Sequence, residues 1–164
     1  MTTFLHTADW QLGKPFGRIE DSAKRARVRQ ERIAVLERIG QVALDRNASF
    51  ILVAGDLFDS PTADRATVSE ACSAIGRLPV PVYAIPGNHD HGGPGGIWEQ
   101  EFFRQEARDL APNFRIFLEP EPVEVEEAVL FPCPLLRRHE TTDTTAWLRG
   151  VASPSGPDHA KPRI

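Results

Sequence analysis

Short apolar segments alternate with longer amphipathic segments along the chain. The segments 3–7, 50–54 and 81–85 each have the length of one strand, and 50–54 is apolar throughout, as a buried parallel strand is. Between them, the segments 22–47 and 62–77 carry apolar residues at steps of three and four, which predicts two helices. This order of strands and helices is typical of an α/β fold with a parallel sheet covered by helices.

The second half of the chain continues the alternation with shorter elements. It predicts a third helix and three short strands over 98–110, 114–118, 123–125 and 128–131. Pro, Gly and Ser are frequent in 153–162, which is typical of a loop, and the next residues, Arg163 and Ile164, suit the start of a strand. We therefore expect residues 1–152 to carry the predicted strands and helices and residues 153–164 to be a loop or linker that leads into a further strand.

Each of the first three predicted strands ends in a polar cluster. The clusters are Asp9-Trp10-Gln11, Gly55-Asp56-Leu57-Phe58-Asp59 and Gly87-Asn88-His89-Asp90. The carboxyl ends of parallel strands meet at one edge of a sheet, so these side chains are expected to lie close together. Each cluster alone is compatible with an ordinary turn or helix cap. A turn has no need of His89, however, and three such clusters in order point to a shared site.

The residue types of the clusters indicate which chemistry the edge supports. Asp9 and Asp56 offer carboxylates, Gln11 and Asn88 offer amide oxygens, and His89 offers an imidazole. Such a set suits Mn, Fe, Zn or Mg better than a metal that prefers thiolates. Asp56 follows the central strand of the three and is the natural bridge between two ions. Two divalent ions close together would clamp a phosphate and lower the pKa of a water between them.

Composition narrows the class of protein. With 41% hydrophobic and 26% charged residues, the chain has the composition of a globular domain. No apolar run approaches the roughly 20 residues of a membrane helix. Two cysteines are too few for a disulfide framework, and the N-terminus lacks the pattern of a signal peptide. We therefore expect a cytoplasmic protein without membrane contact.

The charge is unevenly distributed. The segment 14–38 carries eight basic and four acidic residues, in a chain whose formal net charge is −4. A basic segment of this kind fits a phosphate backbone, and Lys14 and Arg18 are its candidate contacts to nucleic acid. The alternative is a solvated helix face whose charges pair with one another.

Three stretches of the sequence resemble one known family. They are FLHTADWQLGK at 4–14, ILVAGDLFD at 51–59 and IPGNHD at 85–90. With these stretches the chain resembles the calcineurin-like metallophosphoesterases, from Thr2 to about Leu136, and more narrowly the SbcD-type DNA repair exonuclease subunits. Trp10 and the Leu-Gly-Lys that follows Gln11 point to this nuclease branch. The resemblance implies a layered α-β-β-α fold, of which this chain is the N-terminal portion.

The resemblance also implies a role for each residue of the clusters. Two metal ions, with Mn²⁺ as the expected metal, would be held by Asp9 and Gln11 on one side and by Asn88 on the other, with Asp56 bridging them. A hydroxide between the metals would attack the phosphorus in line. His89 would protonate the leaving oxygen or stabilise the transition state. Asp59 and Asp90 would orient the metal ligands by hydrogen bonds without touching the metal ions, and Asp90 would hold His89.

Two features depart from the family pattern. The family usually has Asp-x-His where this chain has Asp9-Trp10-Gln11, and the amide of Gln11 is a weaker donor than imidazole. The family also completes its site with a later histidine and a Gly-His-x-His motif, and both are missing here. His139 and His159 lack the neighbours of those ligands, so we interpret them as surface residues.

The first functional hypothesis is a subunit of a DNA repair or defence complex with metal-dependent DNA exo- or endonuclease activity. By family likeness its partners would be DNA, an SMC-like ATPase and a second copy of itself. An alternative is a truncated, catalytically weak module that binds DNA or a partner. A third hypothesis is a phosphoesterase for small molecules or proteins on the same scaffold.

Overall fold

The computed structural model describes residues 2–151 and 161–164. Its central sheet has four parallel strands in the order β1 (Phe4–Thr7), β2 (Phe50–Ala54), β3 (Val82–Ile85) and β4 (Phe114–Ile116). The predicted α/β class and the parallel arrangement of the first three strands are therefore confirmed. The strand predicted over 114–118 ends at Ile116, although the N–H of Phe117 still donates to the carbonyl of Ala84 at 2.8 Å.

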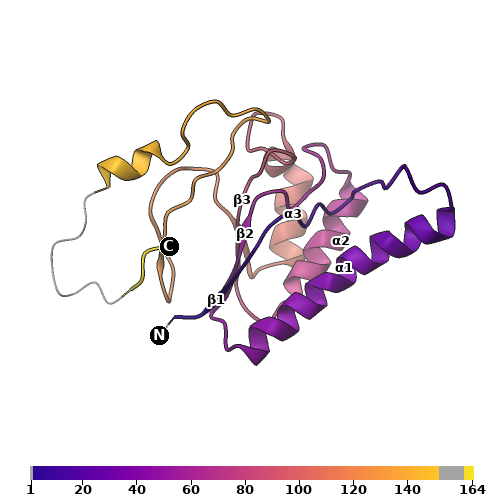
Figure 1. Cartoon of the computed structure of the whole chain (residues 1–164), viewed down its shortest axis with the longest axis horizontal. Helices are drawn as coiled ribbons and strands as arrows, with labels where there is room; N and C mark the ends of the chain where they lie inside the picture. Colours follow the sequence, from indigo (N-terminus) through magenta and orange to yellow (C-terminus); the bar gives the residue numbers. More distant parts are fainter. Residues whose placement is uncertain (1, 152–160) are drawn as a thin grey trace.

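Three helices lie together on one face of the sheet (Figure 1). They are α1 (Ser22–Asp45), α2 (Arg65–Gly76) and α3 (Glu101–Leu110). The carboxylate of Asp21 caps α1 by accepting the N–H groups of Ala23 and Lys24. Asp64 caps α2 in the same way, which is why α2 starts later than the predicted residue 62. A short 3₁₀ turn, η1 (Ile97–Glu99), precedes α3, so the third helix also begins later than predicted.

Strand β2 is apolar on both of its faces because both faces are covered. Ile51 and Val53 of β2 belong to the core between sheet and helices, whereas Phe50 and Leu52 belong to a second apolar cluster on the opposite face. Side chains alternate between the two faces along a strand, so a run without polar residues indicates burial on both sides. The reading of 50–54 as a buried strand rests on this property and agrees with the structure.

A small second layer covers part of the opposite face. Its antiparallel hairpin consists of β5 (Val123–Glu124) and β6 (Val129–Leu130). Ile164 continues this layer, because its N–H donates to the carbonyl of Val129 at 3.0 Å and its carbonyl accepts the N–H of Phe131 at 2.7 Å. Arg163 and Ile164, the residues that suit the start of a strand, thus lie beside β6, where Arg163 forms an isolated parallel bridge with Val129. Most of the predicted linker lies outside the described residues.

In its described residues, the segment after β6 contains an element that the sequence pattern did not predict. This is the 3₁₀ turn η2 (Ala146–Gly150), whose Trp147 stacks on Phe131 with ring centroids 6.0 Å apart. In the described part of the chain, no helix combines the length and the apolar character needed to cross a membrane.

Candidate metal centre at the carboxyl edge of the sheet

The loops after β1 and β2 run side by side beyond the ends of their strands. The N–H of Asp9 donates to the carbonyl of Gly55 at 3.1 Å, and the N–H of Gln11 donates to the carbonyl of Asp56 at 2.8 Å. An isolated parallel bridge between Leu12 and Phe58 continues the same register. The backbone therefore brings the first and second polar clusters together at one edge, as the strand order predicts.

The loop after β3 approaches the loop after β2 through two glycines. A Cβ atom on Gly55 would lie 2.8 Å from the Cα of Gly87, and a Cβ atom on Gly87 would lie 2.1 Å from Oδ1 of Asp56. Any side chain at position 87 would therefore displace the Asp56 carboxylate. The close approach also lets the N–H of His89 donate to Oδ1 of Asp56 at 2.9 Å. The second and third clusters thus meet at Asp56.

The buried carboxylate of Asp90 joins the loops after β2 and β3 through hydrogen bonds. This carboxylate is fully buried and accepts three backbone N–H groups, from Gly87 at 2.7 Å, Phe58 at 3.0 Å and Asp56 at 3.2 Å. Burial raises the pKa of Asp90, and the backbone donors oppose that shift. The carbonyl of Asp90 also accepts the indole N–H of Trp98. The described hydrogen bonds of Asp90 are therefore with the loop backbone and with Trp98.

The contact to the His89 ring comes from Asp59. Nδ1 of His89 lies 3.0 Å from the carbonyl oxygen of Asp59 and 3.9 Å from its Oδ1. Because a carbonyl only accepts, Nδ1 carries the proton in this contact, and Nε2 is the nitrogen available to a substrate. The side chain of His89 is about one-third exposed. The expectation that Asp90 holds His89 is therefore corrected, since the described contact is made by Asp59 while Asp90 binds backbone N–H groups.

Three of the four predicted metal ligands have a strained backbone conformation. Asp9, Gln11 and Asp56 have φ values of 56°, 43° and 54°, in the left-handed region that residues with a Cβ rarely adopt. Such a conformation costs of order 1–3 kcal/mol per residue and is retained where the surrounding structure enforces it, most often at functional sites. Three of the four predicted ligands share this strain, which supports a common function for them.

The basic residues of segment 14–38 have different tasks in the structure. Guanidinium groups of α1 hold the preceding loop: Arg29 donates to the carbonyl of Pro15 at 2.9 Å, and Arg32 donates to that of Trp10 at 2.7 Å. Arg32 also lies over the ring of Phe16, 5.2 Å from its centroid. These arginines therefore stabilise the loop that carries Gln11. Neither interpretation of the basic segment, as a phosphate contact or as a solvated helix face, predicted this role.

The two predicted contacts to nucleic acid differ from each other. The ammonium of Lys14 lies 2.6 Å from Oε1 of Gln11 and 3.3 Å from Oδ1 of Asp59, so it belongs to the centre itself. Arg18 is exposed on the loop, and no hydrogen bond or ion pair joins its side chain to the described residues. Arg18 therefore remains open to a phosphate.

The segment 135–138 lies beside the centre, and the sequence pattern did not predict this position. The N–H of Gly92 donates to the carbonyl of Leu135 at 2.8 Å, and the N–H of Leu135 donates to the carbonyl of Pro86 at 3.2 Å. The exposed Arg137 and Arg138 follow directly and so lie near the loop of His89. The apolar pair Leu135-Leu136 before the arginines was the one sign in the sequence that this segment packs against the rest of the domain.

The two later histidines were interpreted as surface residues. His139 is exposed, in agreement with that interpretation, and His159 lies outside the described residues.

The donor set of the centre is compatible with a divalent ion. Within residues 2–151 and 161–164, no three His, Cys, Asp or Glu side chains come together as a preformed metal site. The three loops instead combine the carboxylates of Asp9 and Asp56 with the amide of Asn88, and Asp9 and Asn88 are exposed at the edge. Oxygen donors of this kind suit hard divalent ions such as Mg²⁺ or Mn²⁺.

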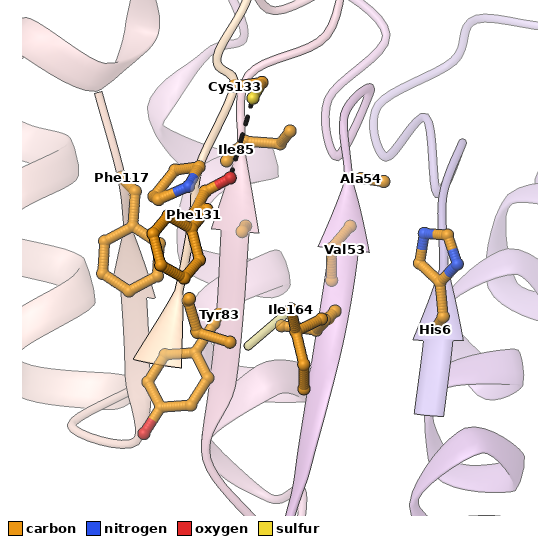
Figure 2. Close-up of a pocket in the computed structure, with 13 residues that line it drawn as sticks. His6, Val53, Ala54, Tyr83, Ile85, Phe117, Phe131, Cys133 and Ile164 are labelled. Carbon is orange, nitrogen blue, oxygen red and sulfur yellow. Dashed lines mark hydrogen bonds between the residues drawn. The ribbon is translucent and has the colours of Figure 1, made fainter. Parts of the chain in front are cut away.

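A separate cavity of about 190 Å³ lies on the other face of the sheet. Figure 2 shows the side chains of Tyr83, Phe131 and Ile164 around it, between the strands and the second layer. Its lining is mostly apolar and includes none of the predicted site residues. This cavity is a gap between the two layers and is distinct from the candidate centre.

Comparison with known proteins identifies the family. The family model of the calcineurin-like phosphoesterases matches residues 2–151. The chain is 33% identical over 101 residues to the uncharacterized metallophosphoesterase YhaO of Bacillus subtilis, an alignment that covers 58% of this chain and 24% of YhaO. It is 35% identical over 95 residues to the DNA double-strand break repair protein Mre11 of Archaeoglobus fulgidus, covering 53% of this chain and 19% of that protein.

A third relative is the SbcD component of the nuclease SbcCD from Bacillus subtilis. It is 35% identical over 91 residues, which cover 53% of this chain and 22% of that relative. The aligned parts thus span about a fifth to a quarter of the length of these relatives. The match of the family model extends over most of the chain, in agreement with the layered fold and the three loops. The chain belongs to the calcineurin-like phosphoesterase family.

Proposed function

We propose that this protein hydrolyses phosphodiester bonds of DNA with the help of divalent metal ions, Mn²⁺ above all. The observation that carries the proposal is the meeting of three loops at Asp56, whose carboxylate is in contact with the loop of His89 and whose backbone is in contact with Gln11. Membership of a family of metal-dependent phosphoesterases supports the hydrolytic chemistry.

Asp9, Asp56 and Asn88 are the residues that would hold the metal ions. A divalent ion bound there neutralises phosphate charge and makes water more acidic. The strained backbone of Asp9 and Asp56 sets the direction in which each side chain leaves the chain, and the N–H of His89 holds the Asp56 carboxylate. The buried Asp90 clamp keeps Asp56 and the loop of Asn88 in register.

His89 is the proposed proton donor. Its Nδ1 is held by the carbonyl of Asp59, which orients the ring and leaves Nε2 as the nitrogen available to a substrate. In the imidazolium form Nε2 carries a proton that it transfers to the leaving oxygen. Asp59 fixes the ring and also pairs with Lys14, so one carboxylate residue joins the first and third loops.

DNA is the proposed substrate because of two observations. Two of the relatives carry names that refer to DNA repair or to a nuclease. In addition, the exposed Arg18, Arg137 and Arg138 lie on segments adjacent to the centre, where they would contact a phosphate backbone. One relative is named as a subunit, which supports a partner protein for this chain as well. On the resemblance to the SbcD-type subunits, we extend the proposal to an ATPase of the SMC type as that partner and to self-association of this chain.

The test measures cleavage of single-stranded and duplex DNA while Mn²⁺ is titrated, with bis(p-nitrophenyl) phosphate as a simple diester and p-nitrophenyl phosphate as a monoester. We expect cleavage of DNA and of the simple diester, and a rate at least about 100-fold lower for His89→Asn, since general acid catalysis contributes 10²- to 10⁴-fold. His139→Asn is the matched control, because His139 is an exposed histidine outside the centre. Equal rates for His89→Asn and the parent would contradict the role of His89.

Two other outcomes would point to different functions. Turnover of the monoester without cleavage of DNA would indicate a small-molecule or protein phosphatase. Tight binding of DNA without cleavage at any Mn²⁺ concentration would indicate a binding module. Either result would contradict the proposal.

A further inference from the structure

The contact between Lys14 and Gln11 occupies the position where the family pattern places a metal ligand. Nζ of Lys14 lies 2.6 Å from Oε1 of Gln11, a short hydrogen bond between an ammonium and an amide. The same ammonium lies 3.3 Å from Oδ1 of Asp59. The Lys14 side chain is about one-third exposed and that of Asp59 about one-fifth, so the pair is partly shielded from water.

The hydrogen-bonding chemistry fixes which end of the Gln11 amide faces Lys14. An ammonium can only donate, so the amide must present its oxygen, and its NH₂ group turns the other way. The backbone reinforces this arrangement, because the N–H of Lys14 donates to the carbonyl of Gln11 at 3.2 Å in a turn with Gly13 at φ 83°. Lys14 is thereby folded back over Gln11.

A metal ion on the same oxygen would meet a positive charge. Oε1 of Gln11 already accepts a hydrogen bond from the Lys14 ammonium. A divalent ion bound to the same oxygen would therefore lie close to Nζ. Like charges at such separations repel strongly where water is partly excluded. Asp59 stabilises the ammonium further, so Lys14 is not easily displaced.

We propose that Lys14 is a built-in cation that replaces one of the two metal ions of this centre. The centre then binds one divalent ion tightly, at Asp56 and Asn88, and a second ion only weakly. This inference rests on the proposed metal-dependent function. Lys14 acts as a positioning residue in this account, because it holds the Gln11 amide and the Asp59 carboxylate while supplying a fixed positive charge.

The inference predicts an effect of opposite sign to that of a merely structural contact. If Lys14 only stabilised the loop, removing its charge would weaken metal binding. If Lys14 competes with a metal ion, removing its charge strengthens the binding of the second ion. The direction of the change therefore separates the two roles.

The experiment measures Mn²⁺ binding to the metal-free protein by the electron paramagnetic resonance signal of free Mn²⁺, without any substrate. We expect the parent to bind one ion per chain tightly and Lys14→Met to bind a second ion at least about tenfold more tightly than the parent. Lys14→Arg keeps the charge and should behave as the parent does. Lys24→Met is the matched control, because Lys24 is an exposed lysine of α1.

Two equally tight ions in the parent would overturn the inference, and so would unchanged or weaker binding in Lys14→Met. Circular dichroism checks that each variant keeps its fold, and Lys14→Gln replaces Lys14→Met if the latter does not. The readout is independent of DNA cleavage. A protein that binds one ion as expected but cleaves no diester would therefore refute the proposed function and leave this inference standing.

Discussion

Replacing Asp90 with asparagine tests how the centre is held together. The side chains have nearly the same shape, but Asn offers one acceptor oxygen and one NH₂ donor where Asp offers two acceptors. The oxygen can still accept the N–H groups of Gly87 and Asp56, which both bond to Oδ1. The NH₂ group then faces the N–H of Phe58, which bonds to Oδ2 in the parent.

The magnitude follows from these contacts. One charge-assisted hydrogen bond is lost and two donors confront each other in a site with no exposed surface. A hydrogen bond to a charged group contributes about 1.5–3 kcal/mol, and a buried unsatisfied donor costs about 1–3 kcal/mol. Removal of the buried charge offsets part of this cost. We therefore expect Asp90→Asn to lower the free energy of unfolding by about 2–4 kcal/mol.

Urea denaturation followed by circular dichroism measures this change. With a typical slope for a domain of this size, the unfolding midpoint should fall by about 1–2 M urea. Asp109→Asn is the matched control, because Asp109 is exposed on α3. If Asp90→Asn unfolds at the same urea concentration as the parent and the control, the assignment of Asp90 as the clamp between the two loops is refuted.

Four further predictions concern other parts of the fold. Gly87→Ala should destabilise the protein and weaken Mn²⁺ binding in calorimetry, because its Cβ would lie 2.1 Å from Oδ1 of Asp56. Burial raises the pKa of the Cys72 thiol from 9.0 to about 11, so iodoacetamide at pH 8 should label only Cys133 before unfolding and both cysteines in urea, as counted by mass spectrometry. The folded state holds that proton more tightly, so the stability that Cys72 contributes should be complete below pH 9 and lost as the pH rises toward 11, which urea denaturation at several pH values measures. Arg32→Met should increase proteolysis of the 10–19 loop, because the hydrogen bond to the carbonyl of Trp10 is lost.

The sequence predicted the features that depend on local pattern. The apolar run at 50–54 indicated a strand buried on both faces, and the apolar steps of three and four predicted a helix that starts at residue 22, where α1 begins. The three polar clusters follow strands of a parallel sheet, so their meeting at one edge followed from topology alone. These conclusions needed no knowledge of side-chain contacts.

The remaining features depend on contacts that leave no pattern in the sequence. The hydrogen-bond partners of the Asp90 carboxylate are backbone N–H groups, and a backbone donor has no residue type to recognise. The hydrogen bond between Lys14 and Gln11 depends on the turn at Gly13, which decides whether the lysine points away from the amide or folds back onto it. The docking of Leu135 on the loop of Gly92 joins segments more than 40 residues apart through main-chain hydrogen bonds.

The most direct test of the account is Mn²⁺-dependent cleavage of a DNA oligonucleotide by the parent and by Asp56→Asn. Asp56 is the residue at which all three loops meet, through its carboxylate to His89 and its backbone to Gln11. The account predicts cleavage by the parent that EDTA abolishes, and a folded Asp56→Asn variant with little Mn²⁺-dependent cleavage. Equal cleavage by the two proteins would contradict the account, because the reaction would then take place without the residue around which the centre is built.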